Sequence, residues 1–233
     1  MILAAGLGTR LKPFTEKHPK ALLPINGKSL LQRNIEYLQS FNVKDVIVNV
    51  HHFAKQIIDA TEQNNGWGST ITISDESDLV LETGGGLKKA TAYLQDSADS
   101  FVLMNADILT DLKIDELKKL HQQSGALATL AVTEKTTSRY LLFDEKNILC
   151  GWLNEKTGEQ KGKAGNKKAF SGIHIISPKI FDHITEEGKF SMIDLYLRLA
   201  AEGFTINCYD HSDGQLLDVG KPESIAIAEQ MFA

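Results

Sequence analysis

A short apolar run at the start of the chain leads directly into a glycine turn, and this order limits what the chain can fold into. Met1 to Ala5 predicts a buried strand, and Gly6-Leu7-Gly8-Thr9-Arg10 follows it. Glycines without a Cβ atom let backbone N–H groups approach a polyphosphate closely. Arg10 and Lys20 add the positive charge that a triphosphate requires. The stretch therefore predicts a phosphate-binding loop after the first strand of an α/β fold.

Three prolines keep the residues after this turn out of a long helix, namely Pro13, Pro19 and Pro24. Two familiar phosphate loops do not fit, because the dinucleotide fingerprint requires glycine in place of Leu11 and a Walker loop requires it in place of Leu22. The pattern G-x-G-T-R-x-x-P-x-T-x-x-x-P-K fits without a break from Gly6 to Lys20. This pattern resembles the signature of the sugar-1-phosphate nucleotidyltransferases. The alternative is a strand-to-helix turn with incidental surface charges.

The bulk properties indicate one ordinary globular domain. The chain has 233 residues, of which 42% are hydrophobic and 24% charged, and this suits one large α/β domain. A net charge of −5 argues against a general nucleic-acid binder. No apolar run approaches ~20 residues, so neither a membrane span nor a signal peptide is predicted. Cys150 and Cys208 form no metal or disulfide pattern, so we expect a protein of the reducing cytoplasm. The charge and the lack of a long apolar run lead us to expect no nucleic-acid and no membrane partner.

The strand predicted over Val46 to Val50 places three polar side chains at its carboxyl end, where ligands bind in open α/β sheets. These side chains are Asn49, His51 and His52. The histidine pair fits a loop or a substrate contact better than a metal site. The acidic run over residues 75–78 is expected to be a solvated surface.

Two aspartates end apolar runs that lie far apart in the sequence. Asp107 follows the strand predicted over Phe101 to Met104, and Asp218 follows Leu216-Leu217. A carboxylate at the end of a buried strand is costly unless something binds it, and Mg²⁺ held by carboxylates and substrate phosphates meets that need. The alternative for Asp107 is to cap the next segment. Asp218 resembles the second metal aspartate of the family, so we expect both aspartates to converge on one Mg²⁺.

A glycine triplet follows Glu82-Thr83 and is expected to open an amphipathic helix. A bare backbone lets a planar ring lie against a helix start, and the same groups can read the edge of a base. Alone, a glycine triplet is as consistent with a flexible turn. The stretch resembles the family's second glycine motif, which contacts the nucleobase. Its ETGGG form is most similar to the branch that includes N-acetylmuramate-1-phosphate uridylyltransferase and mannose-1-phosphate guanylyltransferase-like proteins.

Beyond Asp107 several strands follow one another, and this predicts a small, partly antiparallel lobe at about residues 126–177 that holds the sugar. Glu155-Lys156 resembles the family's Glu-Lys-Pro contact to the sugar phosphate, although Thr157 replaces the proline, and a plain β-turn is the alternative. Residues 160–168 are expected to form a mobile polar loop. Ser171-Gly172 resembles a family segment that contacts the sugar, and glycine in a strand often marks the close approach of a ligand.

The resemblance covers essentially the whole chain and implies a Rossmann-like α/β fold, with a mixed, mostly parallel sheet flanked by helices and a small antiparallel sugar-binding lobe. It implies one nucleotidyltransferase domain over residues 1–233, divided into a nucleotide-binding part (1–125), the sugar lobe (about 126–177) and closing helices with the second metal aspartate (178–233). No long extension with a further domain is expected after the last helix. Whether the protein is a monomer or a homodimer stays open.

The activity implied is transfer of a nucleotidyl group from an NTP, UTP or GTP, to a sugar 1-phosphate, with Mg²⁺ as cofactor. The alternatives are a metal-dependent glycosyltransferase that uses a nucleotide sugar and a non-catalytic nucleotide-sugar sensor. The implied catalytic residues are Arg10, Lys20 and Asp107, and the implied metal ligands are Asp107 and Asp218. The implied nucleotide contacts are Leu3, Ala4, Ala5, Gly6, Gly8, Thr9, Arg10, Glu82, Thr83, Gly84 and Asn105. The implied sugar-phosphate contacts are Glu155, Lys156, Ser171 and Gly172.

Overall fold

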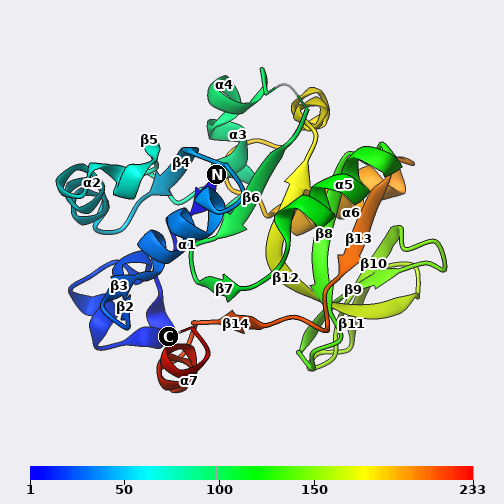
Figure 1. Cartoon of the computed structure of the whole chain (residues 1–233). Helices are drawn as coiled ribbons and strands as arrows, with labels where there is room; N and C mark the ends of the chain where they lie inside the picture. The colour runs from blue at the N-terminus through cyan, green and yellow to red at the C-terminus, as the bar shows by residue number, and fades with distance from the viewer. Residues whose placement is uncertain (98, 233) are drawn as a thin grey trace. The chain divides into compact units, whose positions relative to one another are not determined.

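The structure, a computed structural model, describes residues 1–97 and 99–232 of the chain. The chain divides into two compact units (Figure 1). The first contains Met1–Glu82, Met104–Asp111 and Gln215–Ala233, and the second contains Thr83–Leu103 and Leu112–Gly214. Strand β6 (Phe101–Asn105) contributes residues to both units. The functional division at residues 125 and 177 stays a prediction.

The sheet of the first unit is parallel and has its shortest strand in the middle. Strand β1 (Ile2–Leu3) lies between β4 (Asp45–Val50) and the end of β6, and β5 (Thr70–Asp75) pairs with the far side of β4. The apolar run predicts a longer β1, through Ala5. The strand ends early because the N–H of Ala4 donates to the side chain of Asn49, at 2.6 Å, rather than to a neighbouring backbone.

Helices and short hairpins complete the first unit. Helix α1 (Leu30–Gln39) begins where the Ser29 hydroxyl accepts a hydrogen bond from the N–H of Gln32, at 3.1 Å. The other α-helices are α2 (Ala54–Gln63) and α7 (Glu223–Met231), and single-turn or short 3-10 helices cover Thr9–Leu11, Phe14–Glu16, Lys20–Leu22 and Asn65–Gly68. The two hairpin pairs are β2 (Pro24–Ile25) with β3 (Lys28–Ser29), and β7 (Ile108–Thr110) with β14 (Leu216–Asp218). The prolines thus confine the loop to single turns, as predicted.

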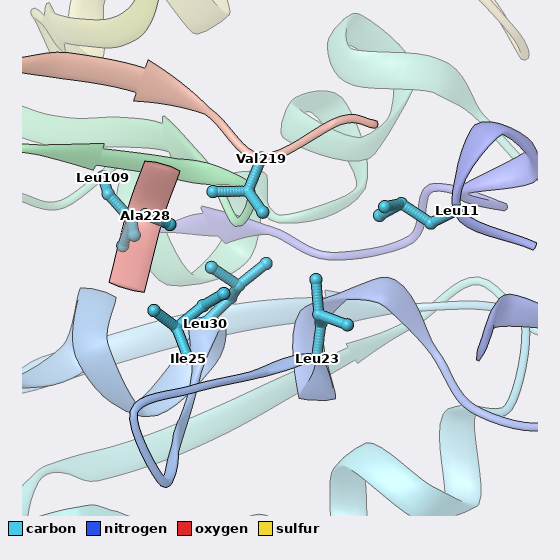
Figure 2. Close-up of a cluster of buried hydrophobic side chains, with 7 residues drawn as sticks. All are labelled: Leu11, Leu23, Ile25, Leu30, Leu109, Val219 and Ala228. Carbon is cyan, nitrogen blue, oxygen red and sulfur yellow. The ribbon is translucent and has the colours of Figure 1, made fainter. Parts of the chain in front are cut away.

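A cluster of buried apolar side chains joins three regions that are far apart in the sequence, at residues 11–30, 109 and 219–228 (Figure 2). Four of its members each stand within three residues of a predicted catalytic or metal-binding residue: Leu11 follows Arg10, Leu23 follows Lys20, Leu109 follows Asp107 and Val219 follows Asp218. The other members are Ile25, Leu30 and Ala228. Because a close-packed cluster holds its backbones in place, these neighbours fix the polar residues from the side away from solvent.

Antiparallel strands dominate the second unit. Strand β12 (Asn166–Ile176) pairs antiparallel with β8 (Ala128–Thr133) and β9 (Arg139–Phe143), and β10 (Leu149–Asn154) lies between β9 and β11 (Glu159–Gly162). Strand β13 (Ile206–Asp210) runs parallel to β8. The helices are α3 (Glu82–Lys89, whose first residue belongs to the first unit), α4 (Thr91–Leu94), α5 (Ile114–Ser124), α6 (Met192–Ala201) and the 3-10 helix Pro178–His183. In the described residues no helix is long and apolar enough to cross a membrane.

Two local predictions are wrong. Residues 160–168, expected to be a mobile loop, form most of β11 and the start of β12. Their lysines are anchored there, since Lys161 pairs with Asp194 at 2.9 Å and Lys168 with Asp210 at 2.6 Å. The glycine triplet lies inside α3, which begins at Glu82, and therefore does not open the helix.

Unfolding of the second unit should depend on pH through His174. Its ring is buried on β12, with Nδ1 2.8 Å from the Tyr196 hydroxyl oxygen, and burial lowers its pKa from 6.5 to about 3. The unfolded chain takes up a proton below about pH 6.5 and the folded chain does not, so stability is present above that pH and is lost as pH falls toward 3. We expect a loss of about 1.4 kcal/mol per pH unit in this window. Urea unfolding at several pH values measures the slope, which His174→Gln should flatten; equal slopes would contradict the assignment.

Candidate active site

The loop after β1 is folded so that Gly8 lies against Lys20. Gly8 has a φ of +60°, and its carbonyl accepts hydrogen bonds from the N–H of Leu11, at 2.9 Å, and the hydroxyl of Thr15, at 3.0 Å. A Cβ atom at Gly8 would lie 2.9 Å from Thr15 Cγ2 and 3.0 Å from Lys20 Cβ, so a larger residue would displace both. Gly6, in contrast, is exposed and has nothing within 4 Å of its Cβ position. Its backbone is therefore open to a ligand.

Lys20 lies between the two aspartates that the sequence singles out. Its ammonium group donates to Oδ2 of Asp107 and lies 3.9 Å from Oδ1 of Asp218. The lysine side chain is only 12% exposed, against 24% for Asp107 and 57% for Asp218. The charge is therefore well shielded at the lysine, and the second carboxylate is the most open of the three groups.

The two backbone segments that carry Asp107 and Asp218 are hydrogen-bonded to each other. Strands β7 and β14 lie side by side (Figure 1). In their pairing Asp218 stands opposite Ile108, and the N–H of Val219 donates to the carbonyl of Asp107 at 2.9 Å. Burial and the nearby charge of Asp107 raise the pKa of Asp218, while the positive charges of Lys20 and Arg10 oppose this shift. The expected convergence of the two carboxylates is thus present in the geometry.

The Arg10 guanidinium lies beside Asp218. A Cβ atom at Gly220 would lie 2.7 Å from Oδ1 of Asp218 and 2.8 Å from Nη2 of Arg10, so both side chains meet the bare backbone of this glycine. The cluster therefore holds two cations and two carboxylates beside an exposed glycine turn. Such an arrangement can bind phosphate groups and, through the carboxylates, a hard cation.

The donor set fits a magnesium ion that is shared with a substrate. Two carboxylates are present, and across residues 1–97 and 99–232 no group of three His, Cys, Asp or Glu side chains is arranged to hold a metal. Mg²⁺ is commonly bound by one or two carboxylates together with substrate phosphates and water, rather than by a cage of protein ligands. Asp107 and Asp218 would be its protein ligands here.

The prediction of an exposed Glu76 is wrong. Glu76, expected in a solvated acidic run, is 1% exposed. It is buried because its carboxylate accepts hydrogen bonds from Nδ2 of Asn49, at 2.8 Å, and from the N–H of Leu81, at 3.2 Å. Nδ1 of His51 lies 2.6 Å from the Glu76 carbonyl oxygen, which accepts only, so this nitrogen carries the ring proton. An acidic residue directly after the strand that borders Asn49 was the only available signal.

Two of the predicted nucleotide contacts, Thr83 and Gly84, lie against Phe190 and Met192 in the second unit. The N–H groups of Gly84 and Gly85 donate to the carbonyl of Phe190 at 2.9 and 3.2 Å, and the Thr83 hydroxyl accepts from the N–H of Met192 at 2.9 Å. A Cβ atom at Gly84 would lie 2.4 Å from the Phe190 ring, so glycine is required here by packing within the protein. Contact of Thr83 and Gly84 with a base stays a prediction.

The predicted sugar residues occupy a turn and a bulge of the second unit. Glu155-Lys156 lies in the turn between β10 and β11, where the N–H of Gly158 donates to the carbonyl of Asn154 at 2.8 Å, and the Glu155 carboxylate accepts from Lys167 at 2.6 Å. The Ser171 hydroxyl is buried, 2.7 Å from Nε2 of His211. Gly172 has a φ of +76°, where the pairing of β12 with β8 shifts register. Their contacts with a sugar stay predictions.

Comparisons with known proteins assign the family. The model of the nucleotidyl transferase family matches residues 1–232. N-acetylmuramate alpha-1-phosphate uridylyltransferase of Caulobacter vibrioides is 31% identical, over 100% of this chain and 96% of that protein. UTP–glucose-1-phosphate uridylyltransferase of Synechocystis sp. and mannose-1-phosphate guanyltransferase of Yarrowia lipolytica are each 29% identical, over 95% and 96% of this chain. The chain spans 60% and 61% of the lengths of these two relatives. The chain therefore belongs to the nucleotidyl transferase family.

Solved structures agree with this assignment. HddC from Yersinia pseudotuberculosis, complexed with GMP-PN, has a TM-score of 0.77 and 28% identity, and the match covers 100% of this chain and 98% of that one. The inositol-1-phosphate CTP transferase from T. maritima has a TM-score of 0.79 at 14% identity, over 99% and 94% of the two chains, and supports the fold alone. The family and the fold class predicted from the sequence, a mixed, mostly parallel sheet flanked by helices with small antiparallel sheets, are confirmed.

Proposed function

We propose that this chain transfers a nucleotidyl group from UTP or GTP to a sugar 1-phosphate and releases pyrophosphate. The observation that carries the proposal is the cluster of Arg10, Lys20, Asp107 and Asp218 beside the exposed Gly6 turn. These residues join shielded positive charge to two carboxylates, and reactions between two phosphate groups require both. Membership of the nucleotidyl transferase family supports the same reaction.

The chemistry needs positioning more than proton transfer. An oxygen of the sugar phosphate attacks the α-phosphorus of the NTP, and the bond from that phosphorus to the bridging oxygen of the β-phosphate breaks. The electron pair of that bond leaves with pyrophosphate. A sugar phosphate is already ionised near neutral pH, so no general base has to remove a proton. The barrier comes from repulsion between anions, which fixed positive charge lowers.

Each residue of the cluster has a role in this scheme. Arg10 and the backbone from Gly6 to Thr9 hold the phosphates that leave, and Lys20 neutralises charge near the α-phosphorus. Asp107 and Asp218 bind Mg²⁺, which when bound neutralises the developing charge and orients the phosphates. The convergence of the two carboxylates supports the metal assignment, and the position of Lys20 beside both of them supports its own role, because it brings positive charge to the place where the phosphates would meet.

The base and the sugar are the finer part of the proposal. Relatives named as uridylyltransferases and as guanyltransferases match at similar identities, and HddC is complexed with GMP-PN. The Glu82-Thr83-Gly84 motif inclines us to UTP. Uridylyl transfer to N-acetylmuramate 1-phosphate and guanylyl transfer to mannose or heptose 1-phosphate are the two reactions to compare first.

The test is pyrophosphate release with Mg²⁺, each of the four NTPs and a panel of sugar 1-phosphates. We expect release with one NTP and sugar phosphate pair, and none when either is omitted. An Asp107→Asn protein prepared in the same way controls for contaminating enzymes. Release that survives this substitution, or silence across the panel together with release of nucleoside diphosphate from nucleotide sugars, would overturn the proposal in favour of contamination or of glycosyl transfer.

A further inference from the structure

A buried carboxylate of the first unit forms no ion pair with a described residue. Glu76 directly follows β5, and its own N–H donates to the carbonyl of Val50 at 2.7 Å. Its hydrogen-bond donors are two neutral amides, from the side chain of Asn49 and the backbone of Leu81. Removing a carboxylate from water is costly, and the cost is offset only where its oxygens are satisfied. The burial of the Glu76 carboxylate therefore requires an explanation, because neither packing in the apolar core nor exposure at the surface accounts for it.

The two oxygens of Glu76 serve two different segments that are predicted to contact the nucleotide. Through Oε1 it orients Asn49, whose own oxygen accepts the N–H of Ala4 at 2.6 Å. Ala4 is the last residue but one before the Gly6 turn. Through Oε2 it accepts from the N–H of Leu81, the residue before Glu82-Thr83. One side chain thus fixes the entry to the first glycine motif and the entry to the second.

We propose that Glu76 is a positioning residue for nucleotide binding, acting through Asn49 and Leu81 on the two segments that contact the NTP. Only a carboxylate suits the place, because both of its partners donate and a glutamine would turn its NH₂ group toward one of them. Asn49 cannot compensate by rotating its amide, since the N–H of Ala4 would then face an NH₂ group. The kinetic part of this inference rests on the proposed function.

The direct test is an exchange of the two side-chain types. In Glu76→Gln one donor loses its acceptor, and in Asn49→Asp two carboxylates face each other, so each single substitution should weaken NTP binding by about 10-fold or more. In the double variant Glu76→Gln/Asn49→Asp the amide and the carboxylate exchange places. The amides of Ala4 and Leu81 then keep an oxygen acceptor, and the net charge is that of the wild type. We expect the double variant to recover NTP affinity to within about threefold of the wild type.

Three measurements separate positioning from loss of fold and from failure of the proposed function. Calorimetric titration with NTP is independent of turnover; wild-type protein that binds no NTP would contradict the proposed function itself. Circular dichroism is used to find a temperature at which every variant is folded. At that temperature the KM for NTP should rise in the single variants, while the KM for the sugar 1-phosphate stays within about twofold of the wild type. Glu116→Gln, which alters a carboxylate that accepts from the Tyr209 hydroxyl, is the matched control. Unchanged NTP affinity in Glu76→Gln, or no recovery in the double variant, would overturn the inference.

Discussion

Lys20→Ala is expected to lower kcat by about 10²- to 10³-fold, on the scale seen when one preorganised electrostatic donor is removed from an active site. The Lys20 side chain is 12% exposed, and its ammonium group lies against Asp107 and near Asp218. Without it, the two carboxylates and the phosphates of both substrates face one another with one cation fewer. The loss should appear in kcat because the repulsion is greatest when the two phosphates approach, and the pyrophosphate-release assay measures it.

Two controls make this result specific. Lys55→Ala removes a lysine that is 86% exposed and pairs with Asp59, and it should leave kcat unchanged. Lys20→Arg keeps the charge but replaces a compact ammonium by a planar group, so partial activity is expected. Circular dichroism shows whether Lys20→Ala is folded. A folded Lys20→Ala protein with kcat within about threefold of the wild type would contradict the role of this residue.

The sequence predicts a phosphate loop after β1 because the residues of its pattern are contiguous, and phosphate binding there stays a prediction. Gly8, Arg10 and Lys20 lie within one pattern, and the structure shows why glycine is required at position 8, where a Cβ atom would meet Thr15 and Lys20. Asp107 and Asp218 could also be singled out, since each follows or ends an apolar run. The convergence itself depends on the β7–β14 pairing, and these strands of three residues each carry no periodic signal.

The wrong predictions for Glu76 and for residues 160–168 have one cause in common, a partner that is distant in the sequence. Glu76 was assigned to the surface from the charge of its neighbours, yet its burial depends on Asn49, 27 residues away. Residues 160–168 are rich in lysine and glycine, and the groups that hold their lysines in strands, such as Asp194 and Asp210, come from distant parts of the chain. Polarity predicts exposure on average, but a long-range partner decides each case, and no local window contains that partner.

Asp107→Asn should reduce kcat by about 10²- to 10³-fold or more while the protein stays folded. The amide keeps the size and one oxygen of the carboxylate but removes the charge that would bind Mg²⁺ and that pairs with Lys20. Raising the concentration of Mg²⁺ should recover part of the lost rate if weaker metal binding contributes. Asp107→Glu keeps the charge on a longer side chain, and its kcat should fall between those of the wild type and Asp107→Asn. Pyrophosphate release across a series of Mg²⁺ concentrations measures both effects, and Asp115→Asn, an exposed position at the start of α5, is the control.

The double variant Lys20→Ala/Asp107→Asn distinguishes one shared centre from two independent contributions. If the residues act together on the same phosphate, the second substitution costs much less than the first, because the arrangement is already lost. Losses that multiply would show that Lys20 and Asp107 act at separate steps, in spite of their contact. A folded Asp107→Asn protein with near-wild-type turnover would remove the metal assignment altogether.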